Sequence, residues 1–378
     1  MPKLDRTYRG AMRRYQLQLL FFSLVYWNLV IRFAIFMRML GARDDHMGDM
    51  LSKGMNFLVD EIISSSVVIS VFATLSWFTL NMVYPRMVRS LKMRKLAVGV
   101  VLVDIVIFLI ISVLLGVVHY GVSQDLSLAE SISHLPRFLF NSTILFFLIV
   151  LFIGGYVYQL LNTLLHQVGY APLGKIMMGY YQKPREEDLI FMFLDLQSST
   201  AVAEKLGHKK YSYFIQDCFK CVSNSLLATR GRVYQFVGDE VVVSWNAKKP
   251  ASYKGAVDFY YLYEKALNKR REYFEKEYGM MPVFTASLNV GKVMAAEVGE
   301  IKRELAFHGD VLNTAARIQK QCKRYRKRIL VTREFAVRLI KNSKEYKIEY
   351  VDLVKFFGKK KSIKIYEVHK IEDNHTSN

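Results

Sequence analysis

The order of apolar and polar positions divides the chain into two unlike halves. Four apolar runs fill the first half, at roughly residues 17–40, 62–83, 97–119 and 138–161. Each run is close to the ~20 residues that a helix needs to cross the hydrocarbon core of a bilayer. We therefore expect an α-helical transmembrane bundle of four helices. The first run is not a cleaved signal peptide, because it is long, contains Arg32 and lacks a small-x-small cleavage site after it.

The charges that flank these runs predict their orientation. Basic clusters lie before the first run, between the second and third, and after the fourth, whereas the other two loops are mixed in sign. Cytosolic flanks of membrane helices collect Lys and Arg. We expect a multi-pass protein of the cell (inner) membrane, surrounded by lipid, with both termini and the second half in the cytoplasm. The basic flanking residues are Lys3, Arg6, Arg9, Arg13 and Arg14; Arg86, Arg89, Lys92, Arg94 and Lys95; and Lys175, Lys183 and Arg185.

Two ionisable residues, Arg32 and Asp104, lie inside the apolar runs. At 1.5 Å per residue they lie ~22 Å and ~10 Å from the cytosolic edge, which is too far apart for an easy ion pair. Arg32 would extend toward the outer surface or meet Asp60 or Glu61. A polar outer pocket that includes His119 would suit an unknown small ligand, and packing without any ligand remains the alternative.

Composition changes with position and divides the chain further. We expect a transmembrane anchor or sensor domain at 1–161, a linker at 162–187, a folded cytosolic domain at 188–370 and a polar tail at 371–378. The linker contains three glycines and two prolines, which exclude one long uninterrupted helix.

The chain is strongly basic, with 53 Lys and Arg against 33 Asp and Glu, or a net charge of +20. Topology explains much of this excess, and anionic lipid or a polyphosphate substrate fits the rest. We expect no nucleic acid partner, and we interpret the basic run 320–328 as a solvated helix end or an electrostatic funnel for polyphosphate. The three cysteines predict no disulfide framework. Cys218 and Cys221 lie in a helical pattern at 211–227, which favours buried thiols.

A short apolar run at 189–196 predicts a buried strand that ends at Asp195 and Leu196. A helical pattern follows at 201–206. A carboxylate at a strand end, followed by hydroxyl groups that open a helix, suits a metal ion and a phosphate group. A plain helix cap would use the same hydroxyls. These hydroxyls belong to Ser198, Ser199 and Thr200.

A second carboxylate lies at a predicted turn. Residues 232–237 and 241–245 are typical of strands, and they flank Gly238-Asp239-Glu240, which predicts a hairpin. Aspartates at the tips of adjacent strands can hold two divalent cations roughly 4 Å apart, which would activate an attacking oxygen and neutralise phosphoryl charge. Asp239 alone is a common turn residue.

A third pattern places Asn313 and Arg317 four residues apart, within the sequence HGDVLNTAAR at 308–317. On a helix they share one face. An amide that orients a ribose and a guanidinium that neutralises a developing phosphorane are complementary tools.

Together, FLDLQSST, YQFVGDE and HGDVLNTAAR resemble the catalytic signatures of class III adenylate/guanylate cyclases, of the bacterial type with an N-terminal membrane anchor. The resemblance covers about residues 186–370. It implies an α+β catalytic domain with a ferredoxin-like βαββαβ core and an antiparallel sheet. It also implies a head-to-tail homodimer whose sites form at the subunit interface.

The resemblance implies a role for each matching residue. Asp195 and Asp239, with the Leu196 carbonyl, would bind two divalent cations, Mg²⁺ or Mn²⁺. Asn313 and Arg317 would position the ribose and stabilise the transition state. Lys359, in the sequence Phe357-Gly358-Lys359, is similar to a triphosphate-binding lysine.

The base-reading positions depart from the family pattern. Gln235 stands where adenylate enzymes often have Lys and guanylate enzymes Glu, and Ala306 stands at the partner position. A glutamine amide donates or accepts, so discrimination rests elsewhere or is weak. We expect ATP as substrate, with GTP or both nucleotides as the alternative and a catalytically silent membrane receptor as the second. The turn VGDEV differs from the GG[DE]EF of diguanylate cyclases. Four helices with few buried charges, followed by a large domain with catalytic motifs, argue against a transporter.

Overall fold

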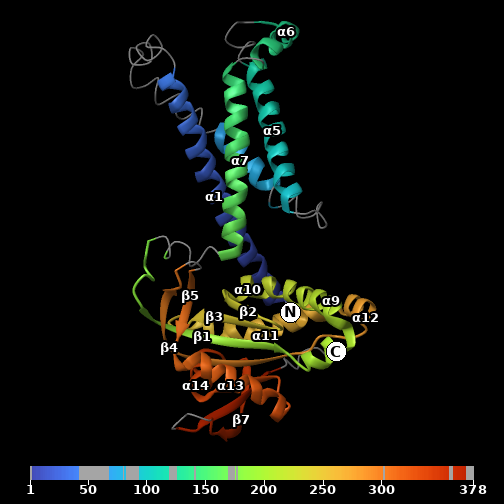
Figure 1. Cartoon of the computed structure of the whole chain (residues 1–378), viewed down its shortest axis with the longest axis vertical. Helices are drawn as coiled ribbons and strands as arrows, with labels where there is room; N and C mark the ends of the chain where they lie inside the picture. Colours follow the sequence, from blue (N-terminus) through green and yellow to red (C-terminus); the bar gives the residue numbers. More distant parts are fainter. Residues whose placement is uncertain are drawn as a thin grey trace. The chain divides into compact units, whose positions relative to one another are not determined.

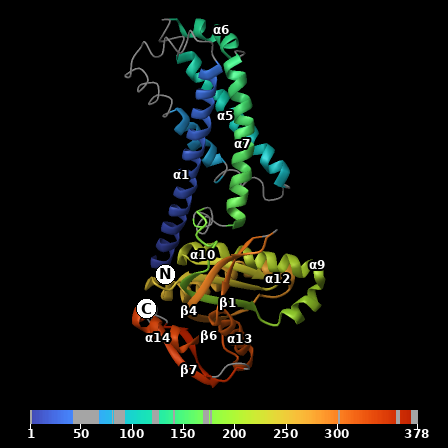
Figure 2. The ribbon, with the colours of Figure 1, turned by 60° about the vertical axis from the view of Figure 1, so that its left-hand side comes forward.

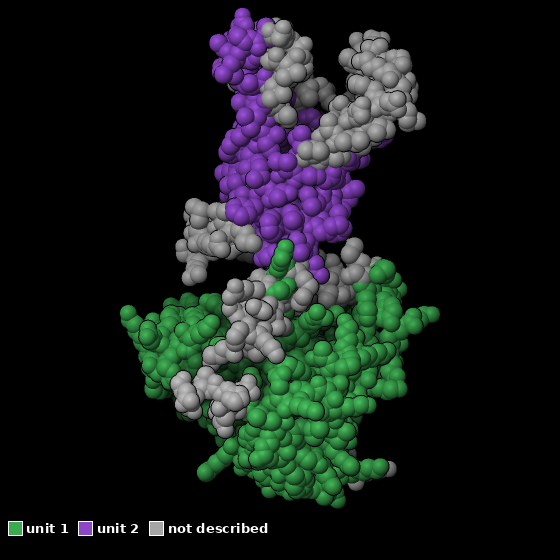
Figure 3. Space-filling model, turned by 180° about the vertical axis from the view of Figure 1, so that it is seen from behind, with its two compact units in different colours: residues 1–13, 175–378 green, residues 14–174 purple. Residues whose placement is uncertain are grey.

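The computed structural model describes residues 2–41, 68–79, 81, 93–118, 126–139, 142–168, 175, 178–300, 303–356 and 361–371. The chain divides into two compact units (Figure 3), one of residues 14–174 and one of residues 1–13 with 175–378. The second unit contains all the strands that the structure describes. Asp60, Glu61, His119 and Lys359 lie outside the described residues.

The described residues of the first unit lie mostly in helices (Figures 1 and 2). Its elements are most of α1 (Pro2–Gly41), a helix at Val68–Phe78, α5 (Met93–Val118), α6 (Leu128–Leu139) and α7 (Ser142–Val168). Two stretches, Gln16–Met37 and Ile144–Leu161, are long and apolar enough to cross a membrane. The second and third predicted runs contain shorter apolar helices, Val68–Phe78 and Leu102–Leu114.

The fourth apolar run begins later than its composition predicted. Residues 138 and 139 belong to α6, a separate amphipathic helix, and α7 starts at Ser142. Ser127 and Glu130 cap α6 reciprocally, because the Ser127 amide donates to Glu130 Oε2 at 2.9 Å and the Glu130 amide donates to Ser127 Oγ at 3.4 Å. This capping box gives α6 a start of its own.

The second unit is built on one sheet with the strand order β2-β3-β1-β4-β6-β8-β7, and β5 pairs with β4. Its strands are β1 (Arg185–Leu196), β2 (Arg232–Val237), β3 (Glu240–Asn246), β4 (Phe284–Val298), β5 (Glu304–His308), β6 (Ile329–Thr332), β7 (Tyr346–Val354) and β8 (Ile363–Lys370). Its helices are α9 (Ser199–Lys220), α10 (Val222–Thr229), α11 (Ala251–Asn268), α12 (Arg271–Tyr278), α13 (Asp310–Tyr325) and α14 (Arg333–Asn342).

The predicted βαββαβ order is present, from β1 through α9 and α10, β2, β3, α11 and α12 to β4. Its strands pair antiparallel, as expected. The sheet as a whole is mixed, however, because β6 pairs parallel to β4. The expectation of a fully antiparallel sheet was therefore wrong. The chain reaches β6 through β5 and α13, a connection long enough to return the strand in the same direction.

Both faces of β1 are covered, which explains its unbroken apolar sequence. Ile190, Met192 and Leu194 belong to the core that α9–α12 and α14 share, whereas Phe191 and Phe193 belong to the core beneath α13. Figures 1 and 2 show helices on both sides of the sheet.

The predicted helix at 211–227 is divided at Cys221, where α9 ends and α10 begins. The cysteines at 218, 221 and 322 are free and buried, as the sequence favoured. Asp217 ties α9 to α12, because the hydroxyls of Tyr273 and Tyr278 each donate to its Oδ2 at 2.7 Å. Despite burial, the hydrogen bonds from Lys220 and these tyrosines lower the pKa of Asp217 to about 2.

Candidate functional site

Asp195 and Asp239 meet at one edge of the sheet. Asp195 lies opposite Glu240 in the antiparallel pairing of β1 and β3, so Asp239, in the turn just before Glu240, lies beside it. Both aspartates are half-buried. Burial, followed by the negative charge of Asp239, raises the pKa of Asp195 to about 6. The structure thus brings the two predicted metal carboxylates together.

Glu240 adds a third carboxylate to which the sequence analysis gave no role. Burial and the charges of Asp195 and Asp239 raise its pKa to about 7, although Lys320 opposes the shift. The only feature of the sequence that indicates a role for Glu240 is its position directly after Asp239. One oxygen of Asp239, Oδ2, is buried and has no hydrogen-bond partner. Clustered carboxylates with an unpartnered buried oxygen suit divalent cations, which prefer oxygen ligands.

The segment after Asp195 turns sharply into α9. Leu196 is buried, and the Gln197 amide donates to the Val283 carbonyl at 2.8 Å. Ser198 is exposed in the left-handed region, with φ of 57°, and its side chain makes no capping bond to α9. The plain helix cap that the sequence allowed is therefore not formed by Ser198. Ser199 is half-buried and Thr200 exposed in the first turn of α9.

Tyr211, on α9, is a neighbour of this cluster that sequence reasoning missed. Its pKa is raised by burial and then by the charges of Asp239 and Asp195, while a hydrogen bond with Ser199 opposes the shift. Its distance in sequence from both aspartates left no local signal.

Asn313 and Arg317 lie on α13, as predicted, with Asn313 exposed and Arg317 half-buried. The helix is held to β4 by polar side chains at every second strand position. Gln319 Nε2 donates to Thr285 Oγ1 at 2.8 Å and to the Thr285 carbonyl at 3.0 Å. Ser287 Oγ donates to the Ala315 carbonyl at 2.8 Å, and Asn289 Nδ2 donates to the Val311 carbonyl at 3.0 Å.

We call this row the polar seam, meaning Thr285, Ser287 and Asn289 of β4 with Val311, Ala315 and Gln319 of α13. Two residues along the strand span ~6.7 Å and four residues along the helix span ~6 Å, so the hydrogen bonds recur at nearly the same spacing on both elements. Thr285 lies opposite Asp195 in the β1–β4 pairing, so Gln319 is the residue of the polar seam on α13 that lies nearest to Asp195.

Asn313 and Arg317, which are predicted to bind the ribose and the phosphate, face away from the contact between Gln319 and Thr285. At 100° per residue, Arg317 and Asn313 lie roughly 160° and 120° around α13 from Gln319. Because Gln319 faces β4, Asn313 and Arg317 face away from the Asp195 edge of their own chain. A single chain therefore assembles the three carboxylates and presents Asn313 and Arg317 elsewhere.

The two predicted base-reading positions each stand next to a residue that contacts the other strand. Gln235 is exposed on β2 and Ala306 half-buried on β5. Their neighbours hold the strands together, because the Phe307 amide donates to the Tyr234 hydroxyl at 3.4 Å and the two rings lie 5.0 Å apart.

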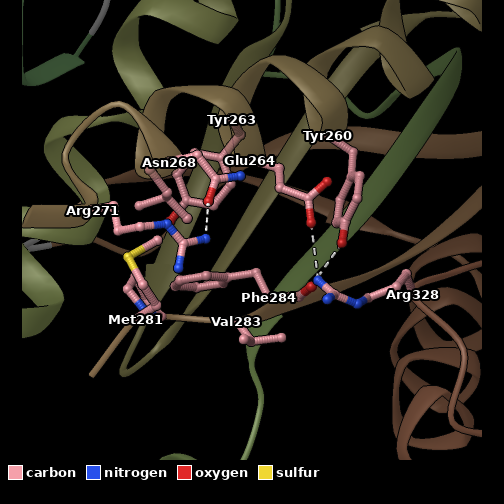
Figure 4. A pocket seen from close by; sticks show the side chains of 11 residues that line it. Tyr260, Tyr263, Glu264, Asn268, Arg271, Met281, Val283, Phe284 and Arg328 are labelled. Atoms are coloured by element: carbon pink, nitrogen blue, oxygen red, sulfur yellow. Dashed lines mark hydrogen bonds and ion pairs between the residues drawn. The ribbon is translucent and has the colours of Figure 1, made fainter. Parts of the chain in front are cut away.

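A cavity of about 170 Å³ lies beside the start of β4, apart from these motifs (Figure 4). Arg328 crosses it and binds Glu264 at 3.0 Å, and Arg271 binds the Asn268 side chain at 3.0 Å. Its arginines are thus engaged by residues of α11. The cavity is lined by Tyr260, Tyr263, Glu264, Leu267, Asn268, Arg271, Met281, Pro282, Val283, Phe284 and Arg328.

Comparison with known proteins identifies a family for the second half of the chain. The family model of the adenylate and guanylate cyclase catalytic domain matches residues 181–370, half of the 378 residues. Adenylate cyclase 2 of Rhizobium meliloti is 27% identical over 164 residues, which cover 43% of this chain and 45% of that protein. An adenylate cyclase of Anabaena cylindrica is 25% identical over 187 residues, covering 48% and 36%. The chain thus spans less than half the length of these two relatives.

Among solved structures, the crystal structure of an adenylyl cyclase from P. aeruginosa aligns with a TM-score of 0.45 and 18% identity, covering 50% of this chain and 97% of that one.

Proposed function

The chain belongs to the adenylate and guanylate cyclase catalytic domain family, and we propose that it is a membrane-bound class III cyclase that converts ATP into 3′,5′-cyclic AMP and pyrophosphate. The observation that supports this most is the carboxylate cluster. Asp195, Asp239 and Glu240 converge at one sheet edge, and Asp239 Oδ2 is buried there without a hydrogen bond. Three adjacent carboxylates destabilise the fold unless a cation compensates them.

Asp195, Asp239 and the Leu196 carbonyl are the residues that we assign to two divalent cations, Mg²⁺ or Mn²⁺. When bound, such cations lower the pKa of the ribose 3′-hydroxyl and neutralise triphosphate charge. Ser198, Ser199 and Thr200 follow at the start of α9, where amide groups and the helix dipole favour phosphate. We assign Lys359 to the triphosphate as well.

The reaction is an in-line displacement, in which the 3′-oxygen attacks the α-phosphorus and pyrophosphate leaves. Its demands are positioning and charge stabilisation rather than a protein nucleophile. Asn313 would orient the ribose, and the Arg317 guanidinium would neutralise the charge that develops on the phosphoryl oxygens.

We infer that two copies of the chain build each site. Asn313 and Arg317 face away from the Asp195 edge of their own subunit, so they would serve the site of a partner copy. A symmetric homodimer then carries two complete sites, because each chain contributes both sets of residues.

ATP is favoured over GTP by the names of the relatives, since both curated proteins described above are adenylate cyclases. Gln235 and Ala306 would face the base. The Gln235 amide can donate or accept, so we keep GTP, or use of both nucleotides, as the alternative.

We assign residues 1–161 to a four-helix membrane anchor in the cell (inner) membrane, 162–187 to a linker, 188–370 to the catalytic domain and 371–378 to a tail. Two apolar helices of spanning length support this placement. The basic flanks support a cytoplasmic location for the termini and the catalytic domain.

The test uses full-length protein in detergent, with Mn²⁺ or Mg²⁺ and with ATP or GTP offered separately. Products are identified by mass spectrometry. We expect cyclic AMP from the wild type and at least 100-fold less from Asp239→Ala. Cyclic GMP alone would keep the reaction and refute the ATP assignment, whereas no cyclic product from a folded dimer would favour the silent receptor.

Complementation tests the shared site. Asp239→Ala and Arg317→Ala should each be inactive alone. Mixed dimers of the two contain one site with both defects and one with neither, so activity should return to about half of the wild-type level per mixed dimer. If each site were formed by one chain, mixing would restore nothing.

A further inference from the structure

Glu349, Glu367 and His369 bring metal-ligating side chains together on β7 and β8, apart from the site described above. β7 is the last strand in the sheet order, and it pairs antiparallel with β8. Glu349 lies directly opposite Glu367, and Lys347 lies directly opposite His369. Residues that lie opposite each other, or two positions apart on one strand, share a face of the sheet. All four side chains therefore project from the same face.

The distances within this cluster are close to those of a tetrahedral metal site. His369 Nε2 lies 3.1 Å from Glu367 Oε2 and 3.9 Å from Glu349 Oε2. One nitrogen or oxygen atom from each of the three residues lies within 4.8 Å of the other two. In a tetrahedral zinc site, with bonds of about 2.0–2.2 Å, neighbouring ligand atoms lie about 3.3–3.6 Å apart. Small rotations of the three side chains are thus enough to bind one ion.

Glu367 is the buried member of the cluster. It is only 5% exposed, whereas the side chains of Glu349 and His369 are each 46% exposed. Its Oε2 atom is ion-paired with Lys327 but makes no hydrogen bond of good geometry. Two carboxylates directly opposite each other on a sheet repel, and a buried carboxylate needs compensation by a cation. An ion between Glu349 and Glu367 would reduce both costs.

Two lysines also contact the glutamates, and they determine how an ion would enter. Lys347 Nζ lies 2.8 Å from Glu349 Oε1, whereas Glu349 Oε2 is the oxygen that faces His369. Lys327, between α13 and β6, contacts the same oxygen of Glu367 as His369 does. An ion bound to Glu367 Oε2 would therefore displace the ammonium group of Lys327, which is partly exposed to solvent.

We propose that Glu349, Glu367 and His369 bind one divalent transition-metal ion, with Zn²⁺ as the preferred occupant and water as the fourth ligand. An imidazole with two carboxylates favours zinc, whereas Mg²⁺ prefers oxygen ligands alone. The ion would join the edge strand β7 to β8. Three strands, β4, β6 and β8, lie between β1 and β7 in the sheet order, so this site is separate from the cations that we assign to Asp195 and Asp239.

The first experiment measures binding of ⁶⁵Zn²⁺ to the untagged full-length protein in detergent, by equilibrium dialysis. The parent protein carries Asp239→Ala and the buffer contains saturating Mg²⁺, so that zinc does not bind at the proposed catalytic site. We expect one Zn²⁺ per chain. His369→Ala and Glu349→Gln should each weaken binding by more than about 10-fold, because even outer-shell partners of a metal contribute roughly 10–100-fold. His208→Ala is the matched control, since His208 is exposed on α9, and its affinity should equal that of the parent.

Lys327→Met distinguishes a metal site from a network of ion pairs. Because Lys327 competes with the ion for Glu367 Oε2, its removal should strengthen zinc binding, in the direction opposite to His369→Ala. Unchanged affinity in Lys327→Met would contradict Glu367 as a ligand and overturn the proposal. Should Lys327→Met fail to fold, the comparison of His369→Ala with His208→Ala still decides, since both histidines are at the surface.

X-ray absorption at the zinc edge identifies the ligands directly. The spectrum of the zinc-loaded parent should contain scattering from one imidazole, and His369→Ala should remove it. A spectrum without imidazole, or equal zinc affinity in the parent, His369→Ala and His208→Ala, would overturn the proposal. The parent lacks one of the proposed catalytic carboxylates, so these results do not depend on cyclase activity.

Discussion

The carboxylate cluster predicts that metal-free protein loses stability as the pH rises. Asp195 and Glu240 have folded-state pKa values of about 6 and 7, raised by burial and by mutual repulsion. The unfolded chain releases these protons near pH 4. The folded state therefore holds more protons between pH 4 and pH 7, and stability falls as the pH passes through the folded values.

The magnitude follows from the two pKa values. Between pH 6 and pH 8, release of the Glu240 proton costs about 1.4 kcal/mol and release of the remaining Asp195 proton about 0.4 kcal/mol. Because both side chains keep some contact with solvent, we expect about 1–2 kcal/mol in total. For a unit of this size that corresponds to a fall in Tm of about 3–6 °C.

All three cysteines of the chain lie in the second unit and are buried, so their reaction with a fluorescent maleimide reports unfolding of that unit. Labelling would be followed on heating between pH 6 and pH 8, normalised to denatured protein at the same pH. The fall in Tm should be present in EDTA and absent in saturating Mn²⁺.

Glu240→Gln should remove most of the pH dependence, because it deletes the larger contribution and relieves Asp195. Glu186→Gln is the control, since Glu186 is an exposed carboxylate at the other end of β1. An equal pH dependence in EDTA and in Mn²⁺, or an unchanged one in Glu240→Gln, would refute the assignment of this cluster.

Three further substitutions test the packing around the site. Asp217→Asn should lower the free energy of unfolding by about 2 kcal/mol above pH 4, and this difference from the wild type should shrink toward pH 2, because the pKa of the carboxyl is lowered to about 2. Urea unfolding at several pH values measures the difference, and a difference that does not change with pH would contradict the reasoning. Gln319→Leu should cost about 1–3 kcal/mol by leaving Thr285 without two hydrogen bonds, and should lower kcat more than it raises KM. Gly291→Ala places a Cβ 2.9 Å from Val311 Cγ2, so it should cost about 1–3 kcal/mol and be rescued in part by Val311→Ala.

The catalytic core was predictable where its signals are local. The apolar run at 189–196 is continuous because both faces of β1 are covered, and the Gly238-Asp239 turn fixed the hairpin that follows. The helical spacing of Asn313 and Arg317 was also readable, since α13 is regular over both. Their assignment to cations and nucleotide remains a prediction.

What the sequence did not disclose depends on contacts between distant segments. The parallel β4–β6 pair, the Tyr211 contact and the polar seam join residues that are far apart in the chain. Glu240 was visible beside Asp239, but its raised pKa comes from burial in the folded unit and from the charge of Asp195, 45 positions earlier. The α6 capping box was a local signal, but the apolar run at 138–161 was identified from hydrophobicity alone, so the start of a separate helix before it was missed.

The polar seam has a mechanical consequence. Its bonds recur only where a helix turn coincides with a strand step, so α13 cannot slide smoothly along β4 and has no alternative position closer than about one turn, ~5.4 Å. Asn313 and Arg317 therefore travel with the strand that lies opposite Asp195. In the proposed dimer, a force that draws these residues into one site must also displace the carboxylate edge of the other. The two sites would then change conformation together, and a signal that reaches either subunit would alter both sites.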